Sequence, residues 1–300
     1  MTTSPFLTRH ACPDARLVTA ACGRVHVVPS GFLYAGRFDD VTNQRHSAVV
    51  YVALTADAFE VQTATARVVT GAVFIGPGVR KRIRAKGPVA SLDITPTHRA
   101  FPRFARAGAT PQAWPRVHFA AVQPALADFR SGDLDMAAAD RLYEQVLGLA
   151  ADRLPPIGPL DPRIRDVLRL LHTQRGRPTQ DLAAAVNLSK DWLAHLFQRE
   201  MGLPLRRYEQ ALKIQAAAAY LKRGVSLTEV AAIAGFSDSA HFSKLWKQHY
   251  GFAPHRSFSG DELFIDPMPW PPCTGMSPGL SPHGPARAPA RGVRRGDSPR

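Results

Sequence analysis

Cysteine is scarce in this chain: Cys12, Cys22 and Cys273 are the only three among 300 residues. Three scattered cysteines do not make a disulfide framework or a zinc site, and they are typical of a reduced, cytosolic protein. No stretch approaches the roughly 18 to 20 apolar residues that span a bilayer. The opening residues, MTTSPFLTRHACPDARL, lack the apolar core of a secretion signal. We therefore expect a cytoplasmic protein that does not insert into a membrane.

Acidic residues are also under-represented, with 24 Asp and Glu against 38 Lys and Arg, for a net charge of +14 and a pI near 10.4. Such a balance favours a polyanionic partner, most often nucleic acid, although an anionic membrane surface or a simple bias toward Arg would also produce it. Residues 161–260 carry 15 Lys and Arg but only 8 Asp and Glu. This segment is therefore the favoured contact for a polyanion.

The chain divides into zones of different pattern. Residues 23–96 alternate short β-branched runs with Gly and Pro, which predicts an antiparallel all-β sandwich or barrel. Residues 134–150 have apolar positions at helical spacing, and this amphipathic helix should pack on the β unit or on a second copy of the chain. A proline-rich linker at 152–160 precedes a helical zone, and the Pro- and Arg-rich residues 261–300 are expected to be disordered.

The helical zone contains one short pattern twice. LAAAVNLSKDWLAHLFQREMG covers residues 182–202, and VAAIAGFSDSAHFSKLWKQHYG covers residues 230–251. In each copy an Ala allows two helices to approach closely, and Asn187 or Gly235 suits a left-handed turn. Ser189 and Ser237 then lie near the start of the next helix, the second sharing its cap with Asp238.

This arrangement is the pattern of a helix-turn-helix, in which the exposed face of the second helix reads DNA. Its buried stripe would be Leu193 with Phe197 in the first copy, and Phe242 with Trp246 in the second. A plain helical bundle with small residues at its crossings is the alternative. Two copies with the same residue classes make that alternative much weaker.

Residues 203–224 separate the two copies and predict a long connecting helix. Two reading helices on one face of a duplex should be one turn apart, about 34 Å. A helix of about twenty residues spans about 30 Å. The spacer therefore suits a single chain that binds two successive turns of DNA.

On these motifs, residues 161–258 resemble the DNA-binding domain of the AraC/XylS family of bacterial transcription regulators. The chain departs from the family's usual residues at Asn187, at Lys213, and at Ser257 with Phe258. The β zone resembles, more weakly, the cupin-like sensor domain often joined to this module. The resemblance implies an α+β multidomain protein: an N-terminal cupin-like β-barrel or sandwich with flanking helices, then an all-α domain with two helix-turn-helix motifs.

The implied organisation is a sensor and dimerisation domain at 1–151, the linker at 152–160, a DNA-binding domain at 161–260 and a tail at 261–300. The two motifs would cover about 179–200 and about 226–249. The resemblance also implies base contacts on the outward face of each second helix, with one residue of each set near the DNA backbone. The implied DNA-binding residues are Lys190, Asp191, Ala194, His195 and Arg199 in the first copy, and Ser239, Ala240, Ser243, Lys244 and Lys247 in the second.

The β zone offers little catalytic chemistry. His26, His46 and His98 are isolated in the sequence, so we expect no metal site, and no nucleophile–base pair stands out. Residues 80–86 form the densest basic run; on a strand, Arg80, Arg82 and Arg84 would share one face, with Lys81 and Ile83 on the other. That run could bind an anionic effector or DNA, or it could simply be a solvated strand.

The sequence therefore predicts a sequence-specific transcription regulator without enzymatic activity or cofactor, acting on double-stranded DNA at the nucleoid. A small-molecule effector would change its DNA occupancy. A homodimer is an option, and RNA polymerase would be a partner of an activator. The alternative is a metal-dependent cupin enzyme fused to a DNA-binding domain. The effector, the target genes and the sign of regulation are not predicted.

Overall fold

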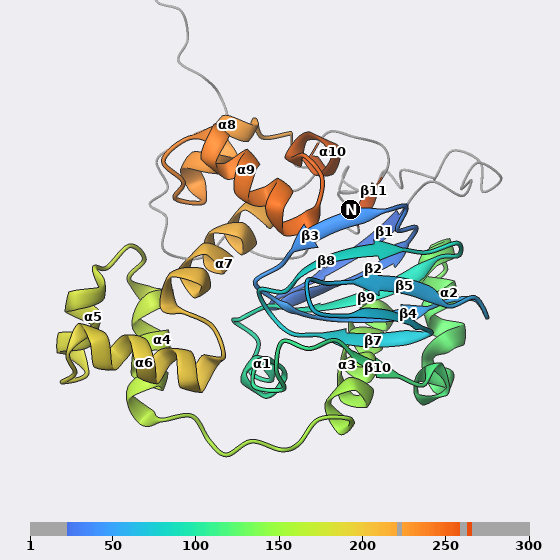
Figure 1. The fold of residues 1–300 in the computed structure, drawn as a ribbon. Helices are drawn as coiled ribbons and strands as arrows, with labels where there is room; N and C mark the ends of the chain where they lie inside the picture. Colours follow the sequence, from blue (N-terminus) through green and yellow to red (C-terminus); the bar gives the residue numbers. More distant parts are fainter. Residues whose placement is uncertain (1–22, 221–223, 259–262, 266–300) are drawn as a thin grey trace, which may run out of the picture. The chain divides into compact units, whose positions relative to one another are not determined.

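The computed structural model describes residues 23–220, 224–258 and 263–265. Short strands fill residues 23–94, as the alternation of β-branched runs and turns predicts (Figure 1). They are β1 (Gly23–Val28), β2 (Gly31–Gly36), β3 (Val41–Gln44), β4 (Ala48–Ala53), β5 (Phe59–Gln62), β6 (Arg67–Thr70), β7 (Ala72–Ile75), β8 (Arg80–Arg84) and β9 (Val89–Ile94).

These strands form two sheets. One has the order β10-β7-β4-β9-β2-β1-β11, with β10 at Gln112–Trp114 and β11 at Leu263–Ile265, and the other has the order β3-β8-β5-β6. All pairs are antiparallel except β1 with β11. The expected antiparallel β unit is therefore confirmed, in the form of two sheets that share a buried apolar cluster.

Strand β4 shows how the larger sheet is buried on both faces. Val49, Tyr51 and Ala53 belong to the cluster between the sheets, whereas the alternating residues Val50 and Val52 belong to a second cluster. Side chains alternate across a strand, so this split assigns one set to each face. Strands buried on both faces are continuously apolar, as the sequence of β4 is.

Helical segments after β9 contribute many of the side chains of the second apolar cluster, the one that contains Val50 and Val52. They are α1 (Phe101–Ala105), a 3₁₀ helix at Arg116–Val122, α2 (Gln123–Ser131) and α3 (Met136–Asp152). The predicted amphipathic helix is α3, and it buries Leu142, Tyr143 and Val146 against the β unit. The His26 imidazole on β1 is 2.8 Å from the Asp140 carboxylate on α3, so this histidine ties the helix to the sheet.

The C-terminal zone is helical, as predicted. Its helices are α4 (Pro162–Thr173), α5 (Thr179–Ala185), α6 (Lys190–Met201), α7 (Leu205–Ala218), α8 (Leu227–Ile233), α9 (Ser239–Tyr250) and α10 (Pro254–Phe258). Asp161 caps α4 by accepting a hydrogen bond from the Arg163 N–H, and Pro162 is its first residue. No helix among the described residues is long and apolar enough to cross a bilayer.

The connecting helix is shorter than the sequence suggests. We expected about twenty residues, but α7 has 14, which corresponds to about 21 Å. The Tyr220 N–H bonds to the carbonyl of Ala217, three residues earlier, so the backbone tightens and the α-helical ladder ends. The remainder of the predicted rod includes residues 221–223, which lie outside the described part of the chain.

A second difference concerns the segment from residue 261, expected to be disordered. Residues Leu263–Ile265 form the short strand β11, in parallel register with β1. Strand β1 would otherwise be a sheet edge, and a few extended residues suffice to pair with it. The rest of that predicted tail, residues 266–300, lies outside the described residues.

Candidate nucleic-acid interface

The first repeat forms two helices joined by a tight turn. Asn187 occupies the turn between α5 and α6 with a φ of 55°, the left-handed conformation that its sequence position predicts. The Leu188 N–H bonds to the carbonyl of Ala183, and Ala183 is buried where the helices approach. The Ser189 hydroxyl accepts a hydrogen bond from the Trp192 N–H at 3.2 Å and so caps α6.

The second repeat has the same geometry. Gly235 occupies the turn between α8 and α9 with a φ of 78°, and the Phe236 N–H bonds to the carbonyl of Ala231. Ser226 and Glu229 form a reciprocal capping box at the start of α8. Asp238 caps α9 by accepting from the His241 N–H, a hydrogen bond that lowers the pKa of this carboxyl.

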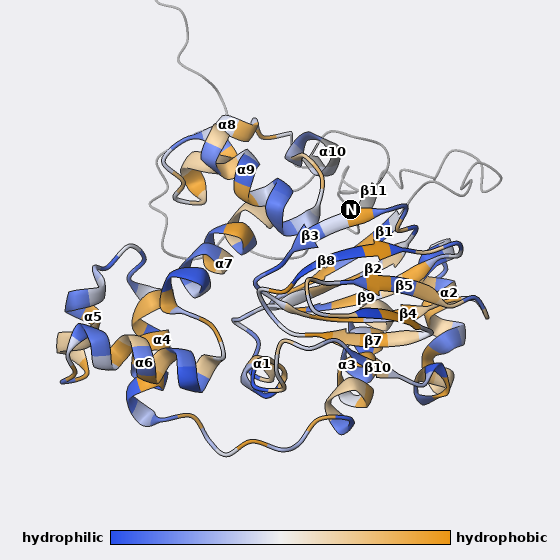
Figure 2. Cartoon of the chain, viewed as in Figure 1, coloured by the Kyte–Doolittle hydropathy of each residue, from blue (hydrophilic) through white to orange (hydrophobic). Residues whose placement is uncertain are grey.

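Each second helix has a buried and an outward face. Leu193 and Phe197 of α6 are buried, as are Phe242 and Trp246 of α9, so the predicted stripes are confirmed. Figure 2 shows hydrophilic and hydrophobic residues along both helices. Because the apolar face of each helix is buried, its polar face is left accessible to a partner.

The residues predicted to contact DNA lie outside these buried stripes. The five on α6 are all exposed; on α9, Ala240, Lys244 and Lys247 are exposed, while Ser239 and Ser243 are half-buried. Trp192 was not predicted as a site residue, yet its side chain is 63% exposed on α6. Trp192 directly precedes Leu193, which the helical spacing assigns to the buried stripe. The same spacing places Trp192 outside that stripe, and this could have identified it as an exposed residue.

Lys213, one departure from the family pattern, has a structural role. Its ammonium lies 5.7 Å from the centre of the Phe236 ring, and its side chain is the neighbour of Gly235 in the turn. Lys213 on α7 therefore packs against the turn of the second motif through a cation–π contact. Ser257, a second departure, is buried.

The last turn of the second helix of each motif contacts the N-terminal part of the chain. On α6, Glu200 forms an ion pair with Arg106 at 2.9 Å. On α9, the Gln248 side-chain amide donates to the side-chain Oε1 of Gln44 at 3.0 Å, and His249 Nδ1 accepts from the His46 N–H at 3.3 Å. Burial lowers the pKa of His249 well below its usual value, so its ring is neutral and able to accept this bond.

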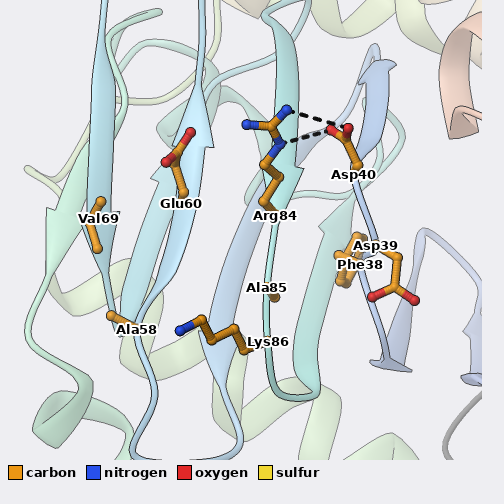
Figure 3. A pocket seen from close by; sticks show the side chains of 9 residues that line it. All are labelled: Phe38, Asp39, Asp40, Ala58, Glu60, Val69, Arg84, Ala85 and Lys86. Atoms are coloured by element: carbon orange, nitrogen blue, oxygen red, sulfur yellow. Dashed lines mark hydrogen bonds and ion pairs between the residues drawn. The ribbon is translucent and has the colours of Figure 1, made fainter.

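A hollow of about 320 Å³ lies over the smaller sheet. Figure 3 shows its lining residues, none of which belongs to α6 or α9. Asp40 at its rim accepts hydrogen bonds from Arg82 and Arg84, which lowers the pKa of the Asp40 carboxyl. The expected division of the basic run is confirmed: Lys81 and Ile83 are buried, whereas Arg80 and Arg84 are exposed. Part of its positive charge is thus neutralised within the chain.

The histidines that are isolated in the sequence have partners within the fold. His98 Nδ1 accepts from the Ala100 N–H at 3.0 Å, and the backbone of His46 bonds to His249. Among the described residues, no three His, Cys, Asp or Glu side chains are grouped as metal ligands would be.

Two consecutive helix-turn-helix units with outward polar faces define a DNA-binding domain of the bipartite type. Residues 182–258 match a family described as a helix-turn-helix domain. The chain is 30% identical over 110 residues to the HTH-type transcriptional regulator GbdR of Pseudomonas aeruginosa, covering 36% of this chain and 30% of that protein. It is 34% identical over 119 residues to YidL, an uncharacterized HTH-type transcriptional regulator of Escherichia coli, covering 38% of each.

The chain therefore spans about a third of the length of these curated relatives. Over that region the predicted resemblance to AraC/XylS regulators is confirmed.

A solved structure matches more of the chain. ToxT from Vibrio cholerae, crystallised with an unsaturated fatty acid, superimposes with a TM-score of 0.51 at 11% identity, covering 78% of this chain and 97% of ToxT. An apo ToxT variant gives a TM-score of 0.52 with 78% and 100% coverage. At this identity the likeness concerns the fold alone. It agrees with the predicted α+β arrangement of a β-rich N-terminal domain followed by a helical domain with helix-turn-helix motifs.

Proposed function

We propose that this protein is a sequence-specific transcription regulator that binds double-stranded DNA through α6 and α9. The observation that carries the proposal is the duplicated motif, in which each second helix buries an apolar stripe and exposes polar residues. The similarity of residues 182–258 to helix-turn-helix regulators supports it. The proposal assigns no reaction to the chain, and its site of action is the nucleoid in the cytoplasm.

The exposed side chains suit base reading in chemically distinct ways. Lys244 can donate to guanine, Asp191 can accept from cytosine, and Ala194 or Ala240 can contact a thymine methyl group. Lys190, His195, Ser239 and Ser243 complete the two candidate faces. Arg199 and Lys247 are assigned to phosphates, which position the protein without reading sequence.

The N-terminal domain is proposed to sense a small-molecule effector. The likeness of the fold to ToxT, which has been crystallised with an unsaturated fatty acid, supports this part. A homodimer would have to use a surface other than the apolar stripe of α3, because that stripe is buried within the chain. If the protein is an activator, it would also contact RNA polymerase.

Genome-wide mapping of bound sites, followed by gel-shift titration on the strongest site, tests this function. The double variant Ala194→Glu with Lys244→Glu adds carboxylates to both reading faces. We expect an affinity loss of at least about 30-fold, because each good base contact contributes about 1 to 3 kcal/mol. The matched control is Ala127→Glu with Arg141→Glu, which changes net charge equally at exposed residues of the N-terminal domain. Equal binding by both double variants would contradict the proposal.

A further inference from the structure

The basic run on β8 belongs to neither helix-turn-helix motif, and one of its arginines differs from the other two. Arg82 and Arg84 both form ion pairs with the Asp40 carboxylate. Arg80, at the start of the same strand, is exposed and forms no ion pair within the described ranges. Its positive charge is therefore available to an anionic partner.

Strand pairing brings Arg80 next to the contact between β3 and α9. Gln44 on β3 lies directly opposite Arg80, so their side chains are neighbours on one face of the sheet. The adjacent pair, Asn43 and Lys81, is buried, and alternation therefore turns Gln44 and Arg80 to the outer face. Because the Gln44 side chain accepts the hydrogen bond from Gln248, Arg80 is one strand away from the last turn of α9.

Two contacts hold the end of α9 against β3. The Gln44 side chain is fixed at both ends, because its Nε2 donates to the Gly78 carbonyl at 2.8 Å while its Oε1 accepts from Gln248. Gly251, the C-cap of α9, lies so close to β3 that an added Cβ would be 2.7 Å from the Thr42 carbonyl oxygen. The end of α9 and the neighbouring strand β8 therefore have a defined relative position.

The candidate base-reading residues of α9 lie on the same side of the helix as Gln248. Ala240, Lys244 and Gln248 are all exposed, and their spacing of four residues places them along one face. In a helix-turn-helix the N-terminal residues of the second helix contact the bases. With Lys244 in the major groove, the last turn of α9 would leave the groove beside the sugar–phosphate backbone. Arg80, next to that turn, would then face the backbone.

A second exposed arginine lies near the same contact. Arg207 on α7 lies against the turn before β8, where an added Cβ on Gly78 would be 2.6 Å from the Arg207 guanidinium. Gly78 is also the residue whose carbonyl accepts from Gln44. Arg207, like Arg80, has no ion-pair partner in the described part of the chain. Two guanidinium groups without carboxylate partners thus lie beside the contact between α9 and β3.

We propose that the N-terminal domain itself contacts the DNA, through Arg80, which binds a backbone phosphate beside the bases that α9 contacts. This inference rests on the proposed function, because the partner is the same duplex. Each DNA strand has a phosphate about every 3.4 Å, and a planar guanidinium binds phosphate through two parallel hydrogen bonds. Phosphate contacts position a protein without reading sequence. Arg80 therefore sets the placement of the second motif, and Arg207 adds positive charge to the same surface.

Gel-shift titration of the full chain on a mapped site, at several salt concentrations, tests this contact. Arg80→Gln removes one phosphate contact, so the slope of log K against log salt should become less steep by about 0.9. At about 0.1 M salt the affinity should fall by about 5- to 10-fold. The same factor should apply to a site with one substituted base pair, because a phosphate contact weakens binding to all sequences alike.

Arg84→Gln is the matched control. It removes the same charge from the same face of β8, about 13 Å farther along the strand, and it leaves the pair of Asp40 with Arg82 in place. Both substitutions are at exposed residues, so the fold should persist, as circular dichroism would verify. The control should keep the wild-type affinity and salt slope. Equal losses in the two variants would reflect net charge alone and would overturn the contact at Arg80.

The opposite arrangement is an N-terminal domain that must move away before α9 enters the groove. Arg80→Gln would then change neither the affinity nor the salt slope, and the proposal would be overturned. If Lys244→Glu abolishes binding to the mapped site while Arg80→Gln does not weaken it, the phosphate contact alone is contradicted. If the wild type binds all sequences equally and Arg80→Gln still lowers the salt slope, the proposed sequence specificity is contradicted and the contact stands.

Discussion

The two helix-turn-helix copies have nearly the same internal geometry but join the rest of the chain differently. The core of the first copy is continuous with the apolar layer on the helical side of the larger sheet. The second copy has a core of its own. At the surface, α6 is held by the Glu200–Arg106 ion pair, whereas on α9 the buried His249 accepts a hydrogen bond from the backbone of His46, just after β3. The same motif is thus attached to the N-terminal part of the chain in two different ways.

The largest expected difference between the copies concerns their cores. Phe197→Ala and Trp246→Ala each remove a buried aromatic side chain and should cost about 3 to 5 kcal/mol. Hydrogen exchange should rise in α8, α9 and the C-terminal part of α7 for Trp246→Ala, because these segments build that separate core. For Phe197→Ala it should rise in α4 to α6 and extend to α1, whose residues share the first cluster. The same exchange pattern in both variants would contradict two separate cores.

Lys81→Met should stabilise the protein by about 1 to 4 kcal/mol at neutral pH, since replacing a costly buried charge by an apolar side chain is often favourable. Because burial lowers the pKa of Lys81 from 10.5 to about 7, the unfolded chain binds more protons between these values. Wild-type stability should therefore rise with pH from about 7 to about 10.5.

Urea unfolding at several pH values measures this dependence. Asp93, Tyr51, Tyr250 and Arg45 face the same space, so the wild type and Lys81→Met are compared at each pH to isolate the contribution of Lys81. The difference in unfolding free energy should shrink above pH 7. A difference that does not depend on pH would show that Lys81 does not titrate as a buried amine.

The turns of the two copies should respond unequally to substitution. Gly235→Ala adds a Cβ at a φ of 78° and should destabilise the second copy by about 1 to 2 kcal/mol. Gly235→Asn should cost less, because Asn187 occupies the equivalent position at 55° in the first copy. Urea midpoints of the three proteins give the comparison. A penalty for Asn equal to that for Ala would contradict the equivalence of the turns.

The ion pair that holds the first copy should contribute least. Arg106 and Glu200 are partly accessible to solvent, so Glu200→Gln should cost less than about 1 kcal/mol. The glutamine can still accept the hydrogen bond that Glu200 accepts from the Asp161 N–H. A double-mutant cycle with Arg106→Gln measures the pair itself. A coupling energy of several kcal/mol would instead make this contact a main attachment of the first copy.

Local features of the helical domain follow directly from the sequence. Asn187 and Gly235 identify the turns, and Asp161, Ser189 and Ser226 cap the helices that follow them. These features depend on residues only a few positions apart, so a single sequence contains all the information. The burial of Lys81 and Ile83 on one face of β8 was likewise predictable, because side chains alternate between the two faces of a strand.

Features that depend on distant residues were not predictable. Strand alternation turns Lys81 inward, but it does not reveal that Asn43, Arg45 and Asp93 meet it there. Those neighbours come from strands whose register is set by the packing of the whole sheet. The end of α7 and the pairing of β11 with β1 also depend on tertiary context, and there the sequence prediction was wrong.

Hydroxyl-radical footprinting on a mapped DNA site tests most directly whether both copies read DNA. The account predicts two protected segments about one helical turn apart, about 34 Å, on the same face of the duplex. Ala194→Glu should remove one segment and Lys244→Glu the other. A single protected segment, or a footprint that neither variant changes, would contradict it.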